Sequence, residues 1–155
     1  MRLMKQIDYI TVHCSATKPN FHGDVDAIRD MHLKRGFSDI GYHIVITQDG
    51  TIQPGRPLKY QGAQVKGHNA NNVGICLIGG LDENGKAANT FSQDQLDSLQ
   101  FVITDLVGKH GVLQKDIKGH RDWFQDLNGD GILDKRDWLK ECPCFDVQQW
   151  LKSLL

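Results

Sequence analysis

The chain of 155 residues lacks a long hydrophobic run, an excess of either charge and a large number of cysteines. No apolar stretch approaches the roughly 18 residues that a membrane-spanning helix needs, and residues 1–9 hold no uninterrupted apolar segment of a secretory signal. The net charge of −1 argues against a protein that mainly coats nucleic acid. Four cysteines are too few for a disulfide scaffold. We therefore expect a soluble monomer made in a reducing cytoplasm, without nucleic-acid partners or membrane insertion.

Apolar residues make up 39% of the chain, which is enough for one core, and we expect a single domain over residues 1–155. β-Branched and apolar runs predict strands at 7–12, 42–47, 51–53, 73–78 and 117–119. Helical spacing predicts helices at 24–35, 92–110 and 145–155, and Ser92 with Gln95 forms a capping box for the second. This order predicts an α/β fold, with a central mixed β-sheet of about five strands flanked by about three helices.

Three residues that follow or lie near these elements have the chemistry of metal ligands. His13 ends the first strand, His120 follows the last, and Cys142 lies in Lys-Glu-Cys-Pro-Cys. Two imidazoles and one thiolate leave a fourth tetrahedral position open for water, as a hydrolytic zinc site requires. Their spacing alone does not separate such a site from ordinary capped or surface imidazoles.

Four motifs are more specific than this spacing. They are Val-His-Cys-Ser-Ala-Thr at 12–17, Gly-Tyr-His-Ile at 41–44, Val-Gly-Ile-Cys-Leu-Ile-Gly-Gly at 73–80 and Lys-Glu-Cys-Pro-Cys-Phe-Asp at 140–146. In this order they resemble the type-2 zinc N-acetylmuramoyl-L-alanine amidases, which include small phage lysozymes of the amidase type and the peptidoglycan-recognition proteins. The similarity runs from Tyr9 to the C-terminus with one interruption.

The resemblance implies a function and a set of site residues. It makes His13, His120 and Cys142 the zinc ligands, and Tyr42 and Lys140 the catalytic residues. A water-derived hydroxide then attacks the amide between the lactyl group of N-acetylmuramic acid and L-alanine. Lys140 is suited to stabilise the developing oxyanion, and Tyr42 to hold or deprotonate the water. Without the resemblance, Tyr42 is an ordinary strand aromatic and Lys140 a surface cation.

The chain departs from the family pattern before the 73–78 strand. Some members have a histidine where this chain has Gln64, and His68 is our candidate to line a substrate cleft instead, although a solvent-exposed loop imidazole explains it equally well. Among the other cysteines, Cys14 and Cys76 are expected to be buried, with Cys14 pointing away from the metal. Cys144 receives no role, and it is the alternative to Cys142 as the sulfur ligand.

The interruption is an insertion. The 21 residues between His120 and Cys142 exceed what the close phage relatives have, and oxygen ligands recur at the spacing of a calcium loop. Gly131 occupies the turn position of this loop, and the final ligand is Asp in place of the usual Glu. We predict an EF-hand- or dockerin-like insertion at 122–139 that binds Ca²⁺ and helps to position Lys140 and Cys142, with a polar surface loop as the alternative. The predicted calcium ligands are Asp126, Asn128, Asp130, the carbonyl of Ile132, Asp134 and Asp137.

The function predicted from these features is zinc-dependent hydrolysis of peptidoglycan, as in endolysins. The alternatives are a recognition module that binds muropeptides without cutting them, and a calcium-dependent interaction protein with an inactive amidase fold. A recycling amidase for anhydro-muropeptides is disfavoured, because those enzymes usually have aspartate at the position of Cys142. Without a secretory signal, we expect the protein to reach the wall after lysis or by non-classical export.

Overall fold

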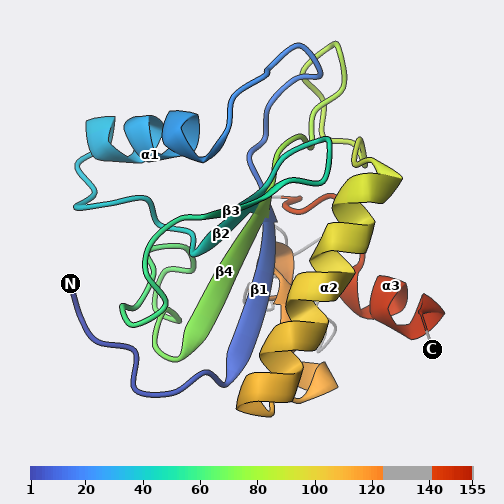
Figure 1. The fold of residues 1–155 in the computed structure, drawn as a ribbon. Coiled ribbons are helices and arrows are strands. Elements are labelled where there is room, and N and C mark those ends of the chain that lie inside the picture. The colour runs from blue at the N-terminus through green and yellow to red at the C-terminus, as the bar shows by residue number, and fades with distance from the viewer. Residues whose placement is uncertain (124–140, 155) are drawn as a thin grey trace, which may run out of the picture.

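The computed structural model of the chain describes residues 1–123 and 141–154, and Figure 1 shows its arrangement. These residues form five strands, three α-helices and two short 3-10 turns. In chain order they are β1 (Tyr9–Cys14), α1 (Val25–Lys34), β2 (Ile44–Ile46), β3 (Ile52–Pro54), β4 (Asn72–Leu77), α2 (Gln93–His110), η1 (Gln114–Asp116), β5 (Ile117–Gly119), η2 (His120–Trp123) and α3 (Val147–Ser153).

The five strands form one mixed sheet in the order β3-β2-β4-β1-β5. β1 pairs in parallel with β4 and with β5, β4 pairs in parallel with β2, and only β3 is antiparallel to its neighbour. The α/β fold with a central mixed sheet and three helices is therefore confirmed. Four parallel strands end at the same edge of the sheet, which is where open α/β sheets bind ligands.

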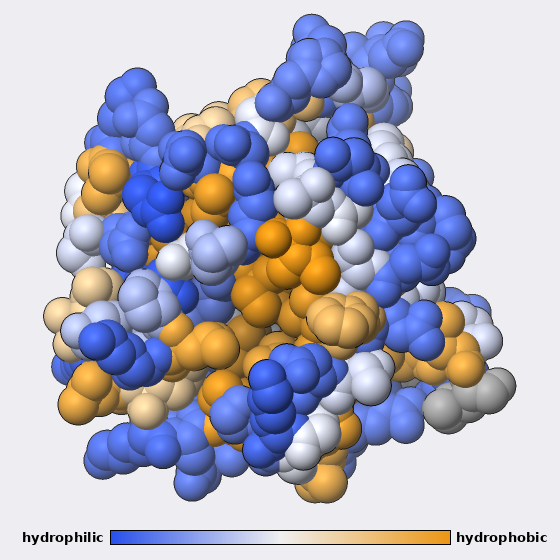
Figure 2. Space-filling view, in the orientation of Figure 1, coloured by the Kyte–Doolittle hydropathy of each residue, from blue (hydrophilic) through white to orange (hydrophobic). Residues whose placement is uncertain are grey.

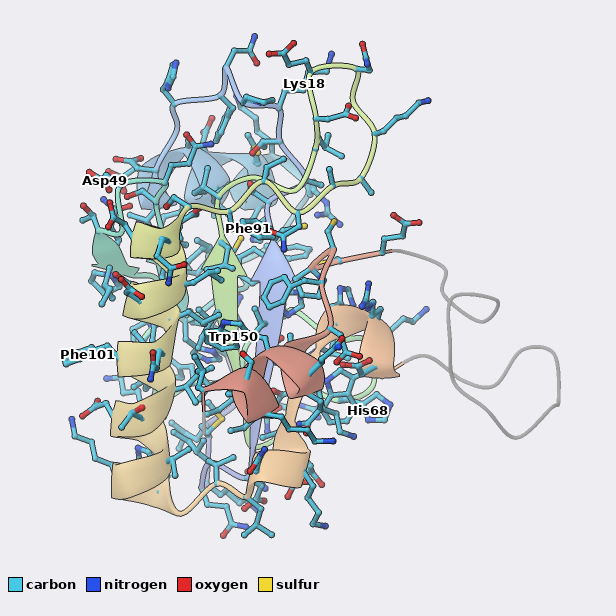
Figure 3. The ribbon with its side chains drawn as sticks, turned by 90° about the vertical axis from the view of Figure 1, so that its right-hand side faces the viewer. Lys18, Asp49, His68, Phe91, Phe101 and Trp150 are labelled. Carbon is cyan, nitrogen blue, oxygen red and sulfur yellow. The ribbon has the colours of Figure 1, made fainter. Side chains whose placement is uncertain are left out.

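Helices α2 and α3 cover one face of the sheet. Alternate strand residues, among them Ile10, Val12 and Ile75, pack against Leu99, Ile103 and Leu106 of α2 and Val147 of α3 in the larger hydrophobic core. Ser92 and Gln95 form the predicted capping box, and Gly111 ends α2 in the left-handed conformation at φ 69°. Phe101 points away from this core and is 68% exposed (Figure 3).

Helix α1 lies on the other face, opposite α2 and α3 (Figure 1). Val25 and Ile28 of α1 pack with Ile40, Val45, Cys76 and Ile78 in a smaller core. The same side of β1 carries the polar residues Thr11 and His13, both buried. Figure 2 views the molecule as in Figure 1 and shows hydrophobic side chains in the middle of that view, with hydrophilic ones around them.

Most element boundaries differ from the predictions by one or two residues, and the differences in β1, β2 and α3 are the informative ones. β1 extends through His13 and Cys14, which pair with Cys76 and Leu77 of β4. β2 begins at Ile44, which is the first residue of this segment to pair with both β3 and β4. α3 begins at Val147, because the side chain of Asp146 accepts from the amide of Gln149 and caps the helix there.

The predicted calcium ligands Asp126, Asn128, Asp130, Ile132, Asp134 and Asp137, and the catalytic candidate Lys140, lie outside the described residues. Within the described part of the chain, no helix is long and apolar enough to cross a membrane.

Candidate metal centre

The two histidines of the candidate site meet because their strands are neighbours. Val12 of β1 pairs with Gly119 of β5, so the next residues, His13 and His120, lie side by side at the carboxyl edge of the sheet. Their ring centroids are 4.6 Å apart. Together with Cys142 they form a group whose ligand atoms all lie within 4.8 Å of one another.

Cys142 reaches this edge from the far end of the chain. Its carbonyl accepts from the amide of Arg121 at 2.9 Å, and its Sγ accepts from the amide of Cys14 at 3.1 Å. The Cys142–Pro143 peptide is cis, and a Cβ at Gly119 would lie 2.8 Å from Cδ of Pro143. A glycine before His120 is therefore what lets the proline pack beside β5 and bring the thiol to the histidines.

The donor set fits a zinc ion. Nδ1 of His13 faces the thiol of Cys142 at 4.0 Å, as two ligands on one tetrahedral ion would. The amide of Cys14 donates to this Sγ, which lies with the two imidazoles in the candidate group. Two nitrogen ligands and one sulfur ligand leave the fourth position for water or substrate.

Tyr42 lies immediately beside this group. Its ring centroid is 4.9 Å from that of His13 and 5.2 Å from that of His32. Burial raises the pKa of the Tyr42 phenol well above 10, with the nearby cysteines adding to the effect. Burial therefore favours the protonated hydroxyl.

A cleft of about 470 Å³ adjoins the candidate metal centre. One wall comes from the end of α1 and the residues after it, and the other from the loop before β4. Arg35 and Lys66 are both exposed, so the rim carries positive charge on either side. The lining residues are His32, Arg35, Phe37, Tyr42, Ala63, Gln64, Lys66, Asn69 and His120.

Four predicted site residues thus come together: His13, His120, Cys142 and Tyr42. Cys144 is not in the group, since its thiol donates to the carbonyl of Gly80 at 3.4 Å.

Two further predictions have mixed outcomes. Cys14 is buried and is absent from the metal group, but its thiol is not remote from the site: hydrogen bonding with Cys142 raises the pKa of Cys14 to about 12. His68 is exposed and packs against Trp123 with ring centroids 4.8 Å apart, beside η2 (Figure 3). It is not among the residues that line the cleft.

His32 is a residue of the site that the sequence did not predict. It is 7% exposed, its Nδ1 accepts from the amide of Gly41 at 2.8 Å, and burial lowers its pKa. The only sequence signal was its place on the apolar side of the 24–35 helix. Gln64 stands where some family members have a histidine. It lines the cleft and contacts His13.

The fold and this residue group define a class of α/β proteins with a candidate metal centre at the carboxyl edge of a mixed sheet. The family model described as N-acetylmuramoyl-L-alanine amidase matches residues 3–143. The endolysin of Escherichia phage T7 is 36% identical over 144 residues, covering 92% of this chain and 84% of the endolysin.

Solved structures agree with this result. The amidase LysC from Clostridium intestinale has a TM-score of 0.73 at 27% identity, covering 96% of this chain and 85% of LysC. Drosophila PGRP-LB has a TM-score of 0.71 at 25% identity, covering 99% of this chain and 84% of PGRP-LB. The chain therefore belongs to the N-acetylmuramoyl-L-alanine amidase family of peptidoglycan hydrolases, which includes phage endolysins.

Proposed function

We propose that this protein is a zinc-dependent amidase that hydrolyses the bond between N-acetylmuramic acid and L-alanine in peptidoglycan. The observation that carries the proposal is the convergence of His13, His120 and Cys142 beside Tyr42 at the end of an open cleft. It occurs in a chain of the amidase family, whose phage members are endolysins.

His13, His120 and Cys142 would hold the zinc ion. When bound, zinc lowers the pKa of a coordinated water to roughly 7 and so supplies hydroxide at neutral pH. The protonated hydroxyl of Tyr42 orients the attacking water or the scissile carbonyl by a hydrogen bond. Lys140 stabilises the negative charge that develops on the carbonyl oxygen.

The cleft supplies the binding site for the peptide stem. Arg35 and Lys66 on its rim are cations, and a stem peptide carries carboxylates that such cations attract. Exposed His68 extends the binding surface along η2 beside Trp123. The protein works as a monomer on the cell wall, which it reaches after lysis or by non-classical export, as expected for a relative of phage endolysins.

The deciding experiment is digestion of purified muropeptides of defined structure, followed by mass analysis. The proposal expects a free lactyl carboxyl on the sugar and a free L-alanine amino terminus on the peptide. Chelator should stop the reaction and added zinc should restore it. Muropeptide binding without either product would instead support the non-catalytic recognition module.

Lys140→Ala tests the proposed oxyanion role. Loss of one oxyanion donor costs about 10²–10³ in kcat, so the variant should retain its zinc content and lose turnover on this scale. Lys152→Ala, at a residue in α3, is the control and should leave turnover unchanged. Full activity of Lys140→Ala would remove this side chain from the mechanism.

The insertion at 122–139 adds a second metal proposal. The ligand spacing from Asp126 to Asp137 supports Ca²⁺ binding that orders the segment leading to Lys140 and Cys142. Isothermal titration of chelator-treated protein with Ca²⁺ should give one site, and Asp130→Ala should abolish it. Binding no tighter than millimolar would contradict the proposal.

A further inference from the structure

Gln64 reaches the candidate metal centre from a loop far away in the sequence. Its Oε1 lies 2.5 Å from Nε2 of His13, across a separation of 51 residues. The other ring nitrogen of His13 is the one that faces Cys142. One imidazole therefore links the candidate metal position to a carboxamide.

The orientation of the Gln64 amide follows from its second partner. Its Nε2 donates to the carbonyl of Asn72 at 3.2 Å, and a carbonyl can only accept. The amide nitrogen must therefore point to Asn72, which leaves the amide oxygen toward His13. Because that oxygen can only accept, Nε2 of His13 carries the proton and Nδ1 keeps its lone pair for a metal.

The loop that carries Gln64 is held in place by two asparagines. Oδ1 of Asn69 accepts from the backbone amides of Gln64 and Val65, each at 2.9 Å. The side chain of Asn72 is completely buried, donates to the carbonyl of His68 at 2.8 Å and accepts from the hydroxyl of Thr11 at 2.8 Å. The position of the Gln64 amide is thus fixed from both ends of the loop.

The sheet leaves space for this side chain. Gly74 lies in the middle of β4, and a Cβ at that position would lie 2.8 Å from Cδ of Gln64 and 2.9 Å from its Oε1. A glycine inside a central strand weakens it, and such glycines often mark a close approach of another group. Here the approaching group is the amide that contacts His13.

We propose that Gln64 is a positioning residue of the metal centre, whose amide oxygen accepts the Nε2–H of His13 and so fixes the tautomer and ring orientation that present Nδ1 to zinc. This inference deepens the proposed function and depends on it. Partners of this kind contribute about 10–100-fold to metal affinity.

The test measures zinc affinity of the metal-free protein at neutral pH by competition with a chromophoric chelator. Gln64→Met removes the acceptor at similar volume and should weaken zinc binding by about 10–100-fold. Gln64→Glu keeps an oxygen for His13 but loses the donor to Asn72, and should stay within a few fold of wild type. Gln61→Met makes the same change in the same loop and should have no effect.

A second readout separates positioning from loop stability. The absorption spectrum of the Co²⁺-loaded protein reports the ligand geometry, so it should change in Gln64→Met and be restored in Gln64→Glu. Circular dichroism of each metal-free variant shows whether it is folded. Gly74→Ala, which leaves Gln64 in the chain but displaces its amide, should also weaken zinc binding.

Three results would overturn the inference. Wild-type zinc affinity and cobalt spectrum in Gln64→Met would show that the acceptor is not needed. Equal weakening in Gln64→Met and Gln64→Glu would show that the bond to Asn72 matters instead. Wild-type protein that binds no zinc would overturn the proposed metal centre itself, whereas loss in the variants alone supports the role of Gln64.

Discussion

The two faces of the sheet are built on different principles. The face under α2 and α3 is a large hydrophobic core in which Ile10, Val12 and Leu99 are fully buried. The one buried polar side chain of α2 among the described residues is Gln95, which donates to the carbonyls of Ile46 and Ile78. The face toward α1 has a smaller core and buries His13, His32 and His43 beside it. Burial of apolar area stabilises the first face, whereas each buried imidazole on the second needs a hydrogen-bond partner to offset its desolvation.

His32 and His43 on the second face form hydrogen bonds with backbone groups of other segments. His43 accepts from the amide of Gly74 at Nδ1 and lies 2.8 Å from the carbonyl of Tyr60 at Nε2. His32 accepts from Gly41 in the same way. Stability is therefore concentrated on one side of the sheet and chemistry on the other. Mutations on the α2 side should mainly change the free energy of unfolding, and mutations on the α1 side should mainly change zinc binding and turnover.

His13→Ala should give the largest effect, and on function alone. It removes a metal ligand and its link to Gln64, so the variant should contain no zinc and release no L-alanine amino termini from cell wall. Metal analysis and the muropeptide assay check both losses, with exposed His110→Ala as the control. Activity retained without zinc would contradict the proposal that the α1 face carries the function through a metal centre.

Leu99→Ala should lower stability and leave function unchanged. Leu99 is fully buried on the α2 face, and removing such a side chain lowers the free energy of unfolding by about 2–5 kcal/mol. Urea unfolding measures this loss. Leu113, which is 56% exposed, gives the control Leu113→Ala, with an expected change within about 0.5 kcal/mol. Zinc affinity and turnover of the folded Leu99→Ala protein should equal those of wild type.

Tyr42→Phe removes one hydroxyl from the site face. Loss of a hydrogen-bonding group in the transition state lowers turnover by about 10²-fold or more, while the ring continues to pack on His13 and His32. We expect unchanged zinc content and an unfolding free energy close to that of wild type. Tyr60→Phe is the matched control. Equal turnover in the two variants would contradict the role proposed for the Tyr42 hydroxyl.

The smallest predicted effect is on the pH dependence of stability. Burial lowers the pKa of His43, so below about pH 6.5 the unfolded chain binds a proton that the folded chain does not. Stability is complete above about 6.5 and is lost as the pH falls toward the folded-state pKa, with a slope of at most about 1.4 kcal/mol per pH unit.

His43→Gln should reduce this slope, as measured by unfolding of the metal-free protein between neutral and mildly acidic pH. The slope should not vanish, because burial also lowers the pKa of His32 and that residue remains. Exposed His22→Gln provides the control. An unchanged slope in His43→Gln would show that this imidazole does not control acid sensitivity.

The sequence predicted the α2 face better than the site face. The capping box at Ser92 and the stop at Gly111 depend on neighbours three or four residues away, and these local signals were confirmed. Gln64 and His13 are separated by 51 residues, so no local pattern could pair them. His32 was missed because a buried histidine on an apolar helix face has the same spacing as a core residue.

The three metal ligands could be predicted only from the resemblance to the amidase family. His120 and Cys142 carry no local signal for a metal, and only the register of β1 with β5 brings His13 and His120 together. Lys140 and the calcium ligands stay predictions, because they lie outside the described residues.

The distance in sequence between His13 and Cys142 also affects when the candidate metal centre can form during synthesis. The thiol of Cys142 and the imidazole of His13 are 129 residues apart in sequence. Nascent chains emerge from the ribosome with the N-terminal part first, so most of the hydrophobic core is available before the last ligand appears. A polypeptide that stops before Cys142 lacks the thiolate and cannot assemble the complete three-ligand centre. The proposed metal centre therefore becomes complete only after the chain has been synthesised as far as Cys142.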